Sequence, residues 1–241
     1  MRVRIWLVAA LAMSAVPAVA RAQVLNFEGI GSTTVQDDPF ILNFYNGGMA
    51  SNGVFGPNLG ITFSANAIEL CLNTLTNLCS NTSRGGLAPT SQFGALDYLT
   101  GTSAFMTRAA GFTTGFSFLY TDPFATGGSF TVYDGVDGTG NVLASLSLGL
   151  TPDGATACPG YNANFCPFVA AGVAFAGTAK SVVFSGVADQ VLFDDVTFGS
   201  VTPGDLGGSP VPEPASLGLM ATGLVGLVAA AGRRRRRARV S

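Results

Sequence analysis

The chain has 241 residues with 12 lysines and arginines, 14 aspartates and glutamates and no histidine, so a Ser-His-Asp triad is excluded. Nine of the basic residues lie before residue 23 or after residue 232, which leaves Arg84, Arg108 and Lys180 between them. A body cut near residue 212 keeps thirteen acidic residues and a net charge of about −10. Such an acidic body is not expected to bind nucleic acid, because basic patches supply that affinity.

Residues 1–22 have the layout of a secretory signal peptide. Arg2 and Arg4 form a basic start, residues 5–12 form an apolar run, and small residues follow. We expect cleavage before Gln23. A retained membrane anchor is the alternative, but the apolar run is short for a span.

Residues 23–200 are predicted to be one all-β domain, because short runs of alternating apolar and polar residues are separated by Gly, Asn, Asp and Pro. In residues 111–120 four aromatic side chains fall on one face: Phe112, Phe116, Phe118 and Tyr120. Further strands are expected around Phe130 and Val132 and at 24–27, 41–45, 61–64, 141–150, 168–175, 181–185 and 191–198. This pattern favours a single β-sandwich, jelly-roll-like, followed by a Gly/Pro linker at 201–210.

The four cysteines form two pairs of equal spacing, Cys71 with Cys79 and Cys158 with Cys166. Four cysteines allow three pairings, and the equal spacing favours the two local ones. Each disulfide would close a polar loop in an oxidising compartment. A zinc site is the alternative, but the spacing lacks the short knuckle of zinc ligands.

One acidic residue interrupts an apolar stripe. In the last predicted strand Leu192, Asp194, Val196 and Phe198 are expected on one face, and a carboxylate that faces a core is costly unless it is paired or bound to a metal. Calcium prefers oxygen ligands, so we predict a structural calcium ion held by Glu28 and Asp194. Carbonyl groups of the turn at 46–48 are further candidate ligands. The alternative is that Asp194 accepts backbone N–H groups at a bulge or is solvated at a sheet end.

The remaining acidic motifs do not predict catalysis. Asp37–Asp38 and Asp194–Asp195 are adjacent pairs, and neighbours on a strand point to opposite faces, so neither pair alone can flank a glycosidic bond. Residues 134–140 resemble a calcium loop, but they lack the terminal glutamate of an EF-hand and fit a hairpin turn better. We therefore predict that the body is not an enzyme.

The last part of the chain combines three features in a fixed order. Val211, Pro212, Glu213 and Pro214 are followed by the uncharged apolar run 215–232, and five arginines follow: Arg233, Arg234, Arg235, Arg236 and Arg237. Eighteen helical residues rise about 27 Å, close to the hydrocarbon thickness of a bilayer. Clustered arginine beside a span stays cytoplasmic, so the body is expected outside. The alternatives are that the apolar run 215–232 is a helix of a protein core and that the arginine run 233–237 is a nucleic-acid-binding patch.

This order resembles the PEP-CTERM sorting signal of Gram-negative bacteria. The resemblance covers residues 211–237 and implies that the chain is a substrate of an exosortase, a membrane-embedded cysteine transpeptidase. It also implies export through the inner membrane, transient anchoring there, and a place at the cell surface or in a biofilm matrix with extracellular polysaccharide.

Short segments of the body are also similar to other PEP-CTERM surface proteins, including 25–28, 43–48, 58–64 and 193–198. The first and last of these resemble the opening and closing strands of jelly-roll carbohydrate-binding modules. In those modules the first aspartate of the closing pair, here Asp194, commonly helps to hold a structural calcium ion.

Two functions follow as hypotheses. The protein is either a structural component of the surface or matrix, or a lectin-like module that binds a defined glycan. A sugar-binding face usually exposes aromatic rings, for which the candidates are Tyr45, Tyr98, Tyr133 and Tyr161. A glycosidase on the same fold would need two opposed carboxylates that the sequence does not place.

Overall fold

The computed structural model describes residues 22–72, 79, 93–124, 127–158 and 164–204. These residues lie in one compact unit, Arg21–Ser209. They form eleven strands and the four-residue helix α1 (Gly154–Ala157). The strands are β1 (Gln23–Leu25), β2 (Ile61–Phe63), β3 (Ala67–Cys71), β4 (Gly94–Tyr98), β5 (Ser103–Phe112), β6 (Gly115–Thr121), β7 (Ser129–Tyr133), β8 (Val142–Ser147), β9 (Val169–Ala174), β10 (Ala179–Ser185) and β11 (Leu192–Phe198).

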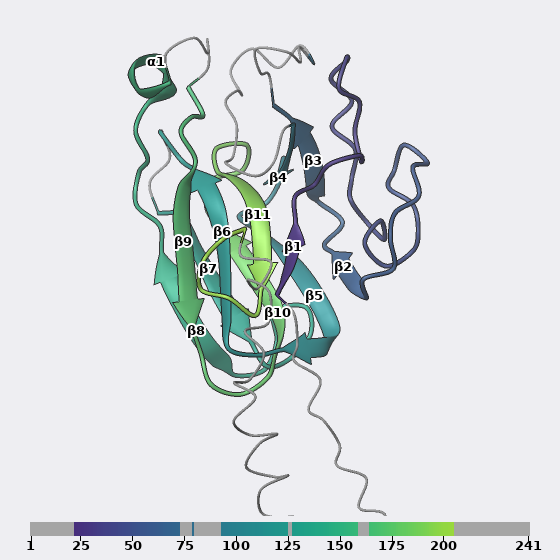
Figure 1. Ribbon diagram of the computed structural model, residues 1–241, viewed down its shortest axis with the longest axis vertical. Helices are drawn as coiled ribbons and strands as arrows, with labels where there is room; N and C mark the ends of the chain where they lie inside the picture. The colour runs from purple at the N-terminus through teal and green to yellow at the C-terminus, as the bar shows by residue number, and fades with distance from the viewer. Residues whose placement is uncertain (1–21, 73–78, 80–92, 125–126, 159–163, 205–241) are drawn as a thin grey trace, which may run out of the picture. The chain divides into compact units, whose positions relative to one another are not determined.

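The strands form two antiparallel sheets (Figure 1). The first has the order β3-β4-β11-β6-β9, with β1 also paired to β11, and the second has the order β2-β5-β10-β7-β8. Only the connections β3–β4 and β7–β8 join strands of the same sheet. The prediction of an all-β fold is therefore confirmed, and the chain crosses repeatedly between the two sheets.

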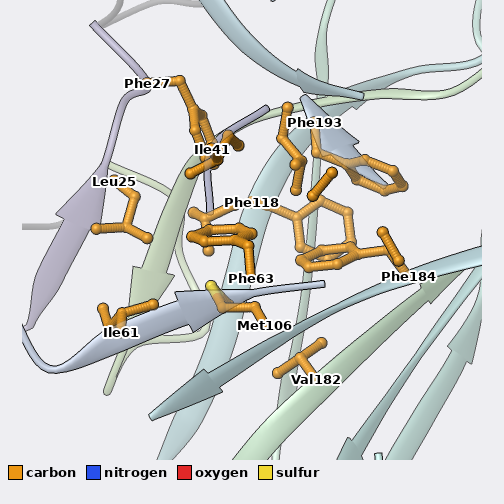
Figure 2. Packing of buried hydrophobic residues seen from close by; sticks show 14 of the residues in the cluster. Leu25, Phe27, Ile41, Ile61, Phe63, Met106, Phe118, Val182, Phe184 and Phe193 are labelled. Atoms are coloured by element: carbon orange, nitrogen blue, oxygen red, sulfur yellow. The ribbon is translucent and has the colours of Figure 1, made fainter. Parts of the chain in front are cut away.

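One apolar core lies between the sheets. Figure 2 shows Phe118 and Phe193 of the first sheet beside Met106 and Phe184 of the second. The ring centroids of Phe184 and Phe193 are 4.7 Å apart, and those of Phe118 and Phe184 are 5.7 Å apart. Because rings of both sheets interdigitate, the two sheets pack on each other as in a β-sandwich.

The outer face of the first sheet is covered as well. A second apolar cluster joins β3, β4, β6 and β11 to Phe165 and Phe168: Ile68, Leu70, Leu72, Ala95, Leu119, Phe165, Phe168 and Leu192. These four strands are buried along their whole length. Strands buried on both faces do not alternate between apolar and polar residues.

Several strand predictions were wrong in detail. Residues 41–45 form turns rather than a strand, because the N–H of Phe44 bonds the carbonyl of Ile41 and Leu42 has a φ of +48°. The run 111–120 is two strands, β5 and β6, separated by a turn in which Thr114 has a φ of +80°. The four aromatic residues of that run do lie in the core, as predicted: Phe112, Phe116, Phe118 and Tyr120.

Strands β3 and β4 were not predicted, and most of β5 was also missed. Each of β3 and β4 carries a buried acidic residue, Glu69 and Asp97 respectively. A charged residue within a five-residue run hides its apolar character, so the sequence pattern indicates a loop there.

Candidate functional site

Glu28, the first predicted calcium ligand, follows β1 and bonds the start of β4. Its Oε1 atom accepts the backbone N–H groups of Phe93 at 2.6 Å and Gly94 at 3.0 Å. The backbone of Phe27 and Glu28 packs so closely on Gly94 that a Cβ there would meet the Phe27 carbonyl carbon at 2.6 Å. Glu28 thus fixes the segment after β1 to the first sheet.

Asp194, the second predicted ligand, is fully buried in β11, and its Oδ1 atom accepts the N–H of Asp195 at 2.6 Å. The register with β6 shifts between Asp194 and Thr197, and Asp195 has a φ of +48°. These are the marks of a β-bulge, in which one extra residue interrupts the alternation of faces.

Because of the bulge, the side chains of the last strand do not all lie on the face that the sequence predicts. Leu192 lies in the outer cluster, whereas Val196 and Phe198 lie in the main core. An extra residue between these positions moves the later side chains to the other face. Asp194 therefore does not share one apolar face with Val196 and Phe198, although its burial was anticipated.

Tyr45 connects the two predicted ligands with a third carboxylate. Burial raises the pKa of the Tyr45 phenol, and a hydrogen bond with the backbone of Phe27 partly offsets this rise. The negative charges of Asp194, Glu69 and Glu28 raise the pKa further. The phenol thus lies within electrostatic reach of all three carboxylates. Glu28 and Asp194 thus both act on the phenol of Tyr45, which does not fix the distance between the two carboxylates.

Glu69 is the acidic residue that sequence reasoning missed. It is 3% exposed, and burial, followed by the charges of Asp37, Glu28 and Asp38, raises its pKa to about 8. Its Oε2 atom has no hydrogen-bond partner among the described residues. The signal that could have found it is the apolar character of its neighbours, Ile68 and Leu70.

These carboxylates do not by themselves define a metal centre. Within the described ranges, no three side chains of His, Cys, Asp or Glu are placed so that they could hold a metal ion. One carbonyl of the 46–48 turn, that of Gly48, accepts the N–H of Gly56 at 3.0 Å. The calcium ion at Glu28 and Asp194 stays a prediction.

Both predicted disulfides are present. Cys71 bonds Cys79 with a Cα–Cα distance of 6.2 Å, and Cys158 bonds Cys166 with a distance of 6.1 Å. The second bond lies beside Phe165 in the segment that covers the outer face of the first sheet. The zinc alternative for these cysteines is thereby excluded.

Two of the four tyrosines that are candidates for a sugar-binding face are buried in the structure. Tyr45 and Tyr98 are buried, Tyr133 is half-buried, and Tyr161 lies outside the described residues. In the described ranges the exposed aromatic rings are those of Phe40, Phe55 and Phe124, with exposed fractions of 41%, 72% and 50%.

The predicted hairpin turn at 134–140 is confirmed. The carboxylate of Asp134 accepts the backbone N–H of Asn141 at 2.7 Å and its side-chain amide at 2.9 Å. These hydrogen bonds lower the pKa of Asp134 and close the turn between β7 and β8.

The signal peptide, the motif at 211–214, the apolar run 215–232 and the arginines 233–237 lie outside the described residues. Among the residues that are described, no helix is long and apolar enough to cross a membrane.

Comparisons with solved structures give distant β-domain neighbours. The K2 cleaved adhesin domain of Lys-gingipain matches with a TM-score of 0.40 and 11% identity, over 74% of this chain and 98% of that one. A family 6 carbohydrate-binding module matches with a TM-score of 0.32 and 16% identity, over 50% and 83%. The module CBM6cm-2 of Cellvibrio mixtus lichenase 5A, solved with cellotriose, matches with a TM-score of 0.31 and 10% identity, over 50% and 88%.

No curated protein matches the chain. Residues 210–237 match the family model described as the PEP-CTERM protein-sorting motif. This match confirms the resemblance seen in the sequence at 211–237. The chain carries a PEP-CTERM sorting motif, which implies export and processing by an exosortase.

Proposed function

We propose that this protein is an exported surface or extracellular-matrix protein of a Gram-negative bacterium, sorted and cleaved by an exosortase. The PEP-CTERM motif at 210–237 carries the proposal. In the precursor, residues 215–232 would lie in the inner membrane with Arg233–Arg237 on the cytoplasmic side. Cleavage near Pro212–Pro214 would then release the β domain from the anchor.

The chemistry of the body supports this destination. Two disulfides suit an oxidising compartment outside the cytoplasm. The body has a net charge of about −10, so repulsion would keep it soluble among anionic polymers. We therefore place the mature protein in the exopolysaccharide or biofilm matrix.

The sorting step is tested by replacing Pro212, Glu213 and Pro214 with alanine in the native host. The wild-type protein should reach the surface or the medium without residues 215–241, and the variant should accumulate in the membrane fraction at precursor mass. The matched control is Pro203→Ala, which changes a proline outside the motif and should be processed normally. Normal processing of the triple variant would overturn the proposal.

A second candidate function is lectin-like binding of a glycan, with a structural calcium ion at Glu28 and Asp194. Phe40 and Phe55 favour it, because both rings are exposed on the segment 39–58 and aromatic rings stack on sugar rings. A glycan array should then show a defined ligand that the variant Phe55→Ala no longer binds. Phe124→Ala, which removes another exposed ring, is the control.

We also propose that the β domain has no catalytic activity. The adjacent carboxylates Asp194 and Asp195 are both buried in β11, where a bulge shapes the backbone around them. Buried carboxylates within a strand do not flank an open space for a sugar. A panel of fluorogenic glycosides should give no turnover, and release of the fluorophore would contradict this proposal.

A further inference from the structure

Apart from β1, which pairs only with β11, the two sheets end in four strands, β2, β3, β8 and β9, and the segment 39–45 covers two of them. In β2, the N–H groups of Ile61 and Phe63 each donate at 3.3 Å to carbonyls of this segment. In β3, the N–H of Glu69 donates to the segment at 2.9 Å. The segment therefore satisfies the outer backbone groups of β2 and β3, as proteins commonly do at edges that would otherwise pair with other chains.

The other two edges, β8 and β9, have no such cover among the described residues. Each is the last strand of its sheet, with β7 the partner of β8 and β6 the partner of β9. The two strands lie near each other on the same side of the domain (Figure 1). One side of the domain thus presents two unpaired strand edges.

Strand β8 lacks the charges that normally protect an edge. No charged residue occurs between Asp137 and Asp153, and β8 lies in the middle of that stretch. Val142 and Leu146 are exposed, with fractions of 56% and 36%. An exposed, uncharged and apolar edge strand is a template for pairing with another strand.

The backbone groups that face away from β7 can be assigned. The N–H of Leu148 bonds the carbonyl of Gly128 at 2.7 Å, so it points toward β7. Neighbouring residues of an antiparallel strand point alternately toward and away from the partner, which directs the N–H and C=O groups of Ser147 and Ser145 outward. Both serines are exposed.

Charge indicates which partner fits this edge. Two copies of a body with a net charge of about −10 repel each other over most of their surface. The stretch between Asp137 and Asp153 carries no charged residue, so two copies can approach there without bringing charges of the same sign together. We propose that two copies of this chain pair antiparallel through β8, so that their second sheets join into one continuous sheet. A two-fold axis makes this contact self-complementary.

The test is the mass of the full-length protein in mild detergent, measured by sedimentation equilibrium over a range of concentrations. The wild-type protein should dimerise, and Ser147→Asp should weaken the dimer roughly tenfold or more, because it adds a negative charge to the paired strand of both copies. Thr100→Asp is the control, since it adds the same charge at an exposed loop position away from β8 and should leave the dimer intact.

Salt gives a second readout. Because screening reduces repulsion between the acidic bodies, the wild-type dimer should tighten as salt rises from about 0.01 M to about 1 M. A wild-type protein that stays monomeric would overturn the proposal. An equally strong dimer in Ser147→Asp would overturn it too. Such a dimer would have to form elsewhere, for example through residues 205–241, which this variant leaves unchanged.

Discussion

The carboxylate of Glu69 lies directly against Gly31, where an added Cβ would overlap its Oε2 atom. The same Cβ position is 3.0 Å from Oδ1 of Asp37. The carboxylates of Glu69 and Asp37 therefore both lie against Gly31, and Glu69 is buried there. The segment after β1 can pack this closely on β3 because residue 31 has no side chain.

This contact predicts a pH-dependent stability. The pKa of Glu69 is raised from 4.5 to about 8 by burial and by the charges of Asp37, Glu28 and Asp38. The folded state holds a proton that the unfolded state has lost, so the contribution of Glu69 is complete below about pH 4.5 and is lost as pH rises toward 8. Urea unfolding at several pH values should show stability falling across this window. Glu69→Gln should flatten that fall, and an unchanged slope in the variant would contradict the assignment.

Removal of the Glu28 carboxylate should destabilise the domain. Glu28→Ala leaves the N–H groups of Phe93 and Gly94 without their acceptor, which should cost about 3 kcal/mol of unfolding free energy. Glu28→Gln keeps an acceptor oxygen and should cost less. Urea unfolding compares the two variants, and equal stabilities would show that these hydrogen bonds contribute little.

Gly94 should tolerate no side chain. A Cβ there would lie 2.6 Å from the carbonyl carbon of Phe27 and 3.1 Å from the nitrogen of Glu28, so the backbone after β1 would have to move. Gly94→Ala should lower the unfolding free energy by about 1–3 kcal/mol. Gly149→Ala, where the added Cβ meets nothing within 4 Å, is the control. Equal thermal midpoints would contradict the close packing.

Loss of the Cys158–Cys166 disulfide should loosen the cover of the first sheet. The bond closes a short loop beside Phe165, and its removal should cost about 2–3 kcal/mol. The double variant Cys158→Ser and Cys166→Ser, measured by thermal unfolding with the other disulfide intact, tests this. No change in the midpoint would mean that Phe165 is held by packing alone.

Calcium should raise the thermal midpoint if Glu28 and Asp194 hold the ion. Binding to the folded state alone stabilises it in proportion to ligand concentration, and a chelator should reverse the effect. Asp194→Asn should remove the calcium response, whereas Asp153→Asn, an exposed residue, should keep it. A wild-type midpoint that does not respond to calcium would exclude the site.

Much of the fold was predictable because short apolar runs separated by Gly, Asn, Asp and Pro mark most of the strands. The aromatic residues of 111–120 were correctly assigned to one face, and the two disulfides followed from equal cysteine spacing. The strands β3 and β4 were missed because Glu69 and Asp97 are buried within them. Nothing in the local sequence shows that both faces of the first sheet are covered.

The candidate site was predicted in part. Burial of Asp194 was expected, but the bulge at Asp195 depends on pairing with β6, a strand distant in sequence. The electrostatic effect of Glu69 on Tyr45, and of Glu28 on Glu69, likewise depends on the first sheet as a whole. The sorting motif was predictable throughout, because it consists of contiguous residues read without a fold.

The central claim is that an exosortase cuts this chain at its PEP-CTERM motif. The most direct test is the intact mass of the protein recovered from the surface or medium of its native host. The account predicts a chain from Gln23 to a residue near Pro212–Pro214, with the hydrogens of both disulfides missing. A mass that still contains residues 215–241 would contradict it and make the protein a tail-anchored membrane protein.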